Sequence, residues 1–211
     1  MDMKKFKEIA EKGEEDKKEI LSLKVEAKQK FKDFFQVMSE SDNIYREKKE
    51  KFVNQFIEDF IKTMEKEGLS IKKEFDIGIV SAEYNDRIIE IRDINYERDK
   101  FYLCIDGECN TEFWVTLPPT SPDYEVWKDN IVICGKELSD FSNNLFDAYE
   151  NFVDYFQTKE EIKEIIKKVQ INIDHFSESI KDADKCDYCI QKWGTEEIYK
   201  NFNGFFESIK E

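Results

Sequence analysis

The sequence has little of what catalytic proteins usually need. Its 211 residues include one histidine, His175, and seven scattered glycines that form neither a G-x-G-x-x-G nor a G-x-x-x-x-G-K motif. Without such a glycine-rich loop, nucleotide binding has no support. His175 is the only imidazole base for a serine or cysteine nucleophile, and its neighbours Ile173 and Phe176 place it on or beside an apolar helix stripe. These scarcities argue against nucleotide-dependent and histidine-dependent catalysis.

Long apolar runs and an excess of basic residues are also missing. The longest uncharged apolar runs fall far short of the roughly 20 residues of a membrane-spanning helix, and residues 1–7 are charged without an apolar signal segment. We therefore expect a cytoplasmic protein with no membrane association. The 48 Asp and Glu against 33 Lys and Arg give a formal charge of −15. This field repels nucleic acid and anionic lipid, so direct nucleic-acid binding is not expected and a basic protein is the favoured partner.

The cysteines are few and odd in number. They are Cys104, Cys109, Cys134, Cys186 and Cys189. An odd set in a chain without a signal segment predicts reduced thiols rather than a disulfide framework. Cys186 and Cys189 have the spacing of two zinc ligands, and His175 lies upstream, but a second cysteine pair is absent. We therefore predict no metal or other cofactor, and keep a zinc site at Cys186, Cys189 and His175 as an alternative.

Apolar residues recur at helical spacing in the first third of the chain. The clearest stripe, at steps of three and four, consists of Ile20, Leu23, Ala27, Phe31, Phe34 and Met38. Gly13 should weaken or break the first turns. The polar residues 39–43 predict a stop, after which a second helix should end at Gly68, with Leu69 packing beyond it. This pattern predicts an N-terminal αα-hairpin.

The apolar period changes from about 3.6 to 2 after residue 70. Alternating residues predict strands around 75–79, 88–94, 101–105 and 109–115, and Asp106-Gly107 is the strongest hairpin signal of the chain. Short connections between them predict an antiparallel meander of four strands. Residues 131–134 can return as a short fifth strand.

Helical spacing returns in the last third. Stripes at 138–156 and 162–180 predict two helices, and Thr158 with Glu161 forms a capping box for the second. Thr195 should cap a last helix. Its apolar face consists of Tyr199, Phe202, Phe206 and Ile209.

The predicted fold is therefore α+β, in a single domain of residues 1–211. The αα-hairpin occupies the helical segment 1–69, the four- to five-stranded meander lies in 70–135, and a three-helix segment in 136–211 packs with it. The helical ends have wide apolar faces that need a cover. They can pack on one face of the sheet or on one another, with two helical lobes joined by the sheet as the alternative.

The segment around the three prolines has features of a binding surface. Rigid loops that carry aromatic residues with an acidic rim suit a basic protein partner. The alternative is that the tryptophans simply cover the sheet. The predicted partner-binding residues are Trp114, Asp123, Tyr124, Glu125, Trp127 and Asp129.

These patterns favour a non-enzymatic, acidic protein-interaction module, such as an inhibitor, immunity or antidefence protein, that binds a basic partner. The bias toward Lys, Glu, Ile, Asn and Phe indicates a bacterial or phage source with AT-rich DNA. The alternative is a zinc-binding regulator or a metal-dependent enzyme. In the enzyme, acidic residues near strands such as Glu90 would hold magnesium, although Arg92 stands where a lysine usually completes such a site. The sequence does not determine the oligomeric state.

Overall fold

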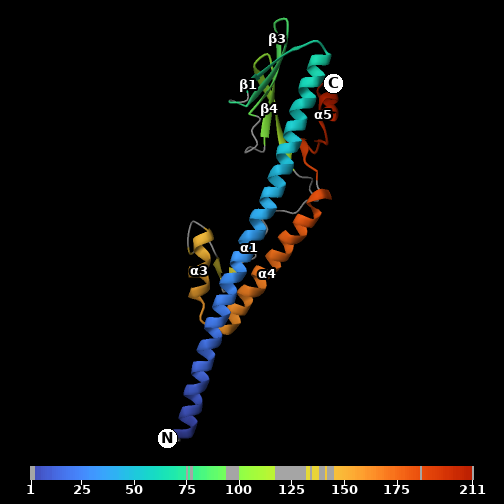
Figure 1. Ribbon diagram of the computed structural model, residues 1–211. Helices are drawn as coiled ribbons and strands as arrows, with labels where there is room; N and C mark the ends of the chain where they lie inside the picture. The colour runs from blue at the N-terminus through green and yellow to red at the C-terminus, as the bar shows by residue number, and fades with distance from the viewer. Residues whose placement is uncertain are drawn as a thin grey trace. The chain divides into compact units, whose positions relative to one another are not determined.

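The computed structural model describes residues 3–74, 76, 78–93, 100–116, 132–133, 135–137, 141, 145–185 and 187–210 (Figure 1). The chain divides into two compact units. The first comprises Met1–Asp42 and Pro122–Lys181, and the second comprises Asn43–Ser121 and Asp182–Glu211. Helix α1 (Met3–Lys66) contributes residues to both units.

The predicted αα-hairpin is wrong, because α1 is one continuous helix of 64 residues. The polar residues 39–43 include neither proline nor glycine, so each costs at most about 0.7 kcal/mol in a helix. Ser41 and Tyr45 are both buried, and packing therefore outweighs this cost. The predicted stop coincides instead with the boundary between the two units, after Asp42. Gly13 does not end the helix either.

The end of α1 confirms the predicted glycine cap. Gly68 has a φ of 85°, in the left-handed region that favours glycine. Its N–H donates to the Glu65 carbonyl at 3.0 Å, and the Leu69 N–H donates to the Met64 carbonyl at 3.0 Å. These two bonds form a Schellman motif, and Leu69 packs against the apolar core beyond it.

The first unit is mainly helical and also contains the short strands β6 (Val132–Ile133) and β7 (Lys136–Glu137). Its helices are the N-terminal part of α1, α3 (Leu145–Tyr155) and α4 (Lys159–Asp182), and their apolar faces share one buried cluster that includes Phe31, Phe34, Phe152, Ile165 and Phe176. The capping box is confirmed: the Thr158 N–H donates to Glu161 Oε2 at 3.2 Å, and the Glu161 N–H donates to Thr158 Oγ1 at 3.3 Å. This box defines where α4 begins.

The second unit contains the sheet and confirms the α+β class. The strands are β1 (Ser70–Glu74), β2 (Ile79–Tyr84), β3 (Arg87–Arg92), β4 (Lys100–Ile105), β5 (Glu108–Thr116), β8 (Cys189–Lys192) and β9 (Ile198–Tyr199). They form an antiparallel sheet in the order β1-β2-β3-β4-β5-β8-β9. The sheet therefore has seven strands rather than the predicted four to five. The meander has five strands, β1 to β5. The predicted strand around 75–79 is wrong: β1 ends at Glu74 and β2 begins at Ile79, and Asp76 and Gly78 lie between them outside any strand. Strands β8 and β9 return from near the C-terminus.

Two further predictions about elements are wrong. The predicted fifth strand is not in this sheet: β6 (Val132–Ile133) pairs only with β7 (Lys136–Glu137) among the described strands. Thr195 does not cap the last helix but lies in the turn between β8 and β9, where its hydroxyl donates to the Lys192 carbonyl at 3.1 Å. Helix α5 (Phe202–Lys210) begins later, and Asn201 caps it by accepting the Gly204 N–H at 3.0 Å.

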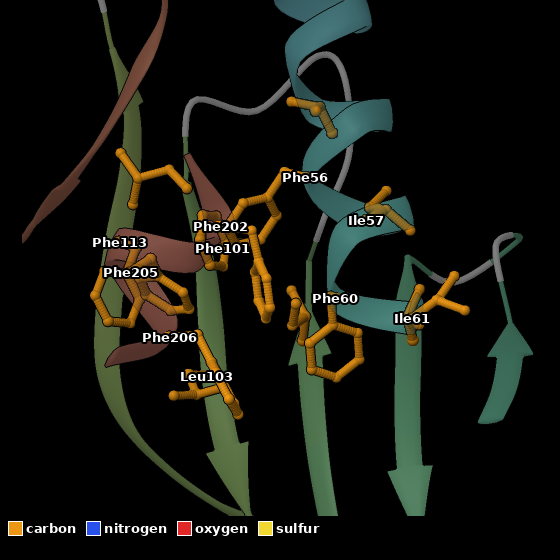
Figure 2. Close-up of a cluster of buried hydrophobic side chains, with 14 of the residues drawn as sticks. Phe56, Ile57, Phe60, Ile61, Phe101, Leu103, Phe113, Phe202, Phe205 and Phe206 are labelled. Atoms are coloured by element: carbon orange, nitrogen blue, oxygen red, sulfur yellow. The ribbon is translucent and has the colours of Figure 1, made fainter. Parts of the chain in front are cut away.

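The core of the second unit lies between the inner face of the sheet, the C-terminal part of α1, and α5 (Figure 2). Phenylalanine rings dominate it. The centroid of the Phe113 ring lies 4.6 Å from that of Phe205 and 5.4 Å from that of Phe101. The ring centroids of Phe56 and Phe202 are 5.2 Å apart. Both helices of this unit thus cover the same face of the sheet.

Candidate functional site

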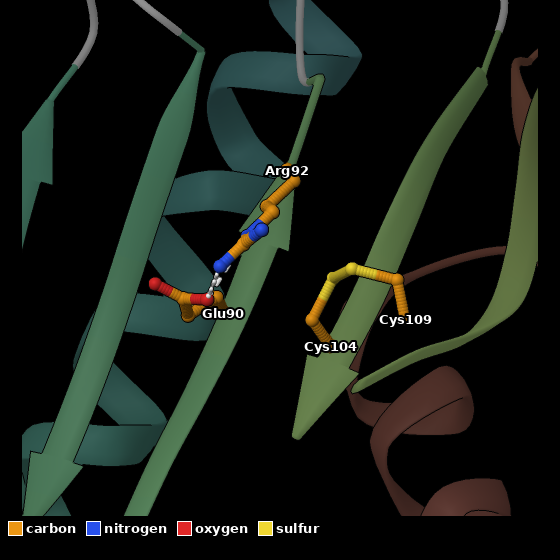
Figure 3. Close-up of a disulfide and its surroundings, with 4 residues drawn as sticks. All are labelled: Glu90, Arg92, Cys104 and Cys109. Atoms are coloured by element: carbon orange, nitrogen blue, oxygen red, sulfur yellow. Dashed lines mark hydrogen bonds and ion pairs between the residues drawn. A yellow bond between two sulfur atoms is a disulfide. The ribbon is translucent and has the colours of Figure 1, made fainter. Parts of the chain in front are cut away.

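The sheet of the second unit has two unlike faces. Buried residues such as Ile91, Leu103 and Phe113 face α1 and α5. Because side chains alternate along a strand, the residues between them point to the opposite side, called here the outer face. Figure 3 views this face, with α1 behind the strands. On β3, β4, β5 and β8 the outer face carries Glu90, Arg92, Lys100, Tyr102, Cys104, Glu112, Trp114, Cys189 and Gln191.

A β-bulge decides which residues of β5 reach the outer face. Cys104 pairs with Cys109, but Leu103 pairs with Thr111, so Asn110 is an extra residue between the two pairs. If Asn110 paired with Leu103, every later residue of β5 would change sides, because the side-chain period of a strand is two. The bulge therefore directs Trp114 outward and Phe113 into the core.

Two tryptophans from distant parts of the chain stack on the outer side. The rings of Trp114 and Trp193 have centroids 5.1 Å apart and planes inclined by 22°. The backbone N–H of Trp193 donates to the Glu112 backbone carbonyl at 3.0 Å, and the Trp114 indole Nε1 donates to Glu112 Oε1 at 2.8 Å. Trp193 nevertheless remains 64% exposed. Glu112 thus holds both members of an aromatic pair that presents one indole to solvent.

Charged side chains beside this pair are largely matched. Lys100 Nζ lies 3.7 Å from Glu112 Oε2 and 5.5 Å from the centre of the Tyr102 ring. The hydrogen bond with Tyr102 and the charge of Glu112 raise the pKa of Lys100, which favours its cationic form. On β3, Arg92 Nη2 donates to Glu90 Oε2 at 2.5 Å (Figure 3). This pairing engages the carboxylate that the metal-dependent alternative would require.

The structure corrects the prediction of reduced thiols at two positions. Cys104 and Cys109 form a disulfide across the β4–β5 hairpin, with Cα atoms 4.0 Å apart (Figure 3). Asp106 and Gly107 form the predicted turn, with φ angles of 52° and 84°. Such a tight turn brings Cys104 directly opposite Cys109, and this proximity is what the count of cysteines could not reveal.

Of the six predicted partner-binding residues, Trp114 lies on the outer face. Asp123, Tyr124, Glu125, Trp127 and Asp129 lie outside the described residues. The prediction missed Trp193, which lies in the turn directly after β8. A tryptophan directly before Gly194, whose φ is 78°, is the local signal of a turn that presents an aromatic ring.

The structure describes two of the three alternative zinc ligands, His175 and Cys189, and they belong to different units. His175 is a half-buried residue of α4 in the first unit, and Cys186 lies outside the described residues. Cys189 is buried, and its thiol donates to the Thr116 carbonyl at 3.3 Å. Burial raises the pKa of this thiol and so disfavours the thiolate that binds metal. The described residues contain no group of three or more metal-ligating side chains.

Comparison with known proteins gives no relative: no family model, curated protein or solved structure matches this chain. In the described ranges, no helix is both apolar and long enough to cross a membrane.

Proposed function

We propose that this chain is a non-enzymatic protein-interaction module that binds a basic segment of a partner protein on the outer face of its sheet. The observation that carries the proposal is the exposed indole of Trp193. The ring stacks on Trp114, and the Trp193 backbone is fixed by its hydrogen bond to the Glu112 carbonyl. Tryptophan is enriched among the residues that dominate binding energy in interfaces. A ring that is already oriented loses little conformational freedom when a partner covers it.

The preference for a basic partner follows from the chemistry around that ring. The face of an indole attracts a lysine or arginine cation, worth about 0.5–1 kcal/mol in water and about 2 when desolvated. The nearby carboxylates of Glu112 and Glu197 are already paired with Lys100 and Lys192, so the local attraction comes from the face of the indole. The net charge of −15 also accelerates association with a cationic protein. Occlusion of such a partner is how an inhibitor, immunity or antidefence protein of bacterial or phage origin would act.

The test compares two exposed aromatic residues of the same sheet. A tagged chain is used to capture partners from a lysate of the source organism, and the purified partner is then titrated against the wild type, Trp193→Ala and Tyr84→Ala. Tyr84 is 57% exposed but lies in register with the inner face of β2. Trp193→Ala should weaken binding about tenfold or more, whereas Tyr84→Ala should change it less than about twofold. Equal affinities for all three proteins would refute a site at Trp193.

Salt and the proline-containing segment provide a second comparison. Binding should weaken as salt rises, because the partner is basic. The acidic residues Asp123, Glu125 and Asp129 are also predicted from the sequence to bind the partner. Their replacement by lysine should weaken binding and reduce its dependence on salt. If binding is unchanged, this segment takes no part, and the proposed surface is confined to the residues around Trp193.

A further inference from the structure

The hairpin disulfide presents its two sulfur atoms unequally. Cys104 is 0% exposed, whereas Cys109, one strand away, is exposed. Both lie on the outer face (Figure 3). Cys104 is two residues before Asp106, and Cys109 is two residues after Gly107. A thiolate that attacks a disulfide must reach one sulfur while the other leaves. Only the Cys109 side of the bond is open to such an attack.

We propose that Cys104–Cys109 is a reversible thiol–disulfide exchange site in which Cys109 is attacked and Cys104 is the leaving and resolving thiol. A low-molecular-weight thiolate attacks Sγ of Cys109 and forms a mixed disulfide, while the Cys104–Cys109 bond breaks and Cys104 departs as a thiolate that takes up a proton. A second thiolate then releases the mixed disulfide as the small-molecule disulfide. The protein gains two electrons and two protons, and the reverse sequence restores the bond.

The surroundings of Cys104 are compatible with its role as leaving group. Cys104 lies directly opposite Glu90 in the β3–β4 register. Burial and a neighbouring carboxylate each disfavour a thiolate at Cys104. Glu90 is, however, bound by the Arg92 guanidinium at 2.9 and 2.5 Å, so a cation accompanies the carboxylate on the same face (Figure 3).

The exchange can be reversible because other interactions hold the hairpin. Phe101 and Phe113 keep β4 and β5 in register from the core side. The Asp106 N–H donates to the Ile88 carbonyl at 2.8 Å, and Asp106 Oδ1 accepts the Ile88 N–H at 2.9 Å, which ties the turn to β3. After reduction, Cys104 and Cys109 should therefore stay opposite each other and re-form their bond readily.

Exchange with the described free cysteine is not expected. Cys189 is buried and pairs with Thr116, seven residues along β5 from Cys109. At a rise of about 3.3 Å per residue, this places the two sulfur atoms on the order of 20 Å apart. Cys134 and Cys186 lie outside the described residues.

The test uses the full chain and needs no partner protein, so its result is independent of the proposed function. The wild type is reduced with glutathione, and the folded state is followed by circular dichroism. Iodoacetamide labelling is then timed residue by residue by mass spectrometry after digestion with a protease that cleaves before aspartate, because Asp106 separates Cys104 from Cys109. We expect an unchanged spectrum and labelling of Cys109 about tenfold or more faster than of Cys104.

Two variants follow the intermediate. With glutathione disulfide, Cys104→Ser should accumulate a stable glutathione adduct on Cys109, whereas the reduced wild type should convert that adduct to the internal disulfide. Cys109→Ser should form an adduct on Cys104 slowly or not at all. The proposal is overturned if the two wild-type cysteines label at equal rates, if reduction unfolds the sheet, or if the bond is reduced only in denaturant. The labelling and reduction results need no variant, so they stand even if a variant does not fold.

Discussion

Truncation of two adjacent residues of β5 should destabilise the protein to very different extents, because the bulge at Asn110 sends their side chains to opposite faces of the sheet. Phe113 is 1% exposed, and its ring contacts Phe101 and Phe205. A phenylalanine side chain buries at least about 150 Å², worth about 4 kcal/mol at 25 cal/mol per Å². Measured truncations of buried phenylalanine cost about 3–5 kcal/mol. Phe113→Ala should therefore lower the free energy of unfolding by about 4 kcal/mol.

Trp114→Ala removes a larger side chain at a smaller cost. Trp114 is half-buried, and the substitution removes its stack on Trp193 and its hydrogen bond to Glu112. An aromatic pair contributes about 0.5–1.5 kcal/mol and a hydrogen bond to a charged group about 1.5–3, and the solvent exposure of the site reduces both. We expect a loss of about 1–2 kcal/mol, which leaves a difference of about 2 kcal/mol or more between the two variants.

Urea unfolding followed by far-ultraviolet circular dichroism measures both values. Phe113→Leu serves as the control, because it keeps an apolar side chain of similar size and should cost well under half as much as Phe113→Ala. A Trp114→Ala loss equal to or greater than that of Phe113→Ala would refute the register on which the outer face depends. It would mean that β5 presents the opposite set of side chains to the core.

The remaining predictions concern the bulge and α1. Deletion of Asn110 removes only the extra residue of the bulge, so every β4–β5 pair should remain intact. The free energy of unfolding should therefore change by less than about 1 kcal/mol. Loss of cooperative unfolding in the deletion variant would contradict the proposed bulge. Gly13→Ala should increase the protection of the surrounding amides from hydrogen exchange, because a Cβ there meets no atom within 4 Å and alanine favours a helix by about 1 kcal/mol. Lys159 donates to Asp16 at 2.6 Å and to Glu19 at 2.5 Å, which lowers the pKa of both carboxyls and raises that of the lysine. The stability that this cluster contributes should thus decrease as the pH falls below about 4 and the carboxylates become protonated. It should also decrease as the pH rises above the usual lysine pKa of about 10.4 and Lys159 loses its proton. Lys159→Met should flatten both slopes in a pH series of thermal melts, and unchanged slopes would mean that other groups cause the pH dependence.

Some features could be predicted because their partners are close in sequence. The cap at Gly68 and Leu69 uses carbonyls three and five residues earlier, and the box at Thr158 and Glu161 spans four residues. The turn at Asp106-Gly107 requires only two residues with positive φ. Local signals of this kind depend on backbone preferences that each residue carries with it.

Other features were missed because they depend on packing. The polar residues 39–43 have weak helix propensities, but these are small beside the burial of Ser41 and Tyr45, so α1 continues. Strand β8 is only four residues long and becomes a strand because β5 lies beside it. Short segments of this kind have too few residues for their own period to be recognised.

The sequence alone determined the α+β class, the cap at Gly68, the capping box at Thr158, the Asp106-Gly107 hairpin and the acidic charge, since each follows from residue type and local spacing. Only the tertiary structure decided that Trp193 stacks on Trp114 from 79 positions along the chain, that Cys104 bonds to Cys109, and that a bulge turns Trp114 outward. These outcomes depend on which strands pair and in what register. Register is set by the burial of residues such as Phe113 across the whole sheet, and no local pattern carries that information.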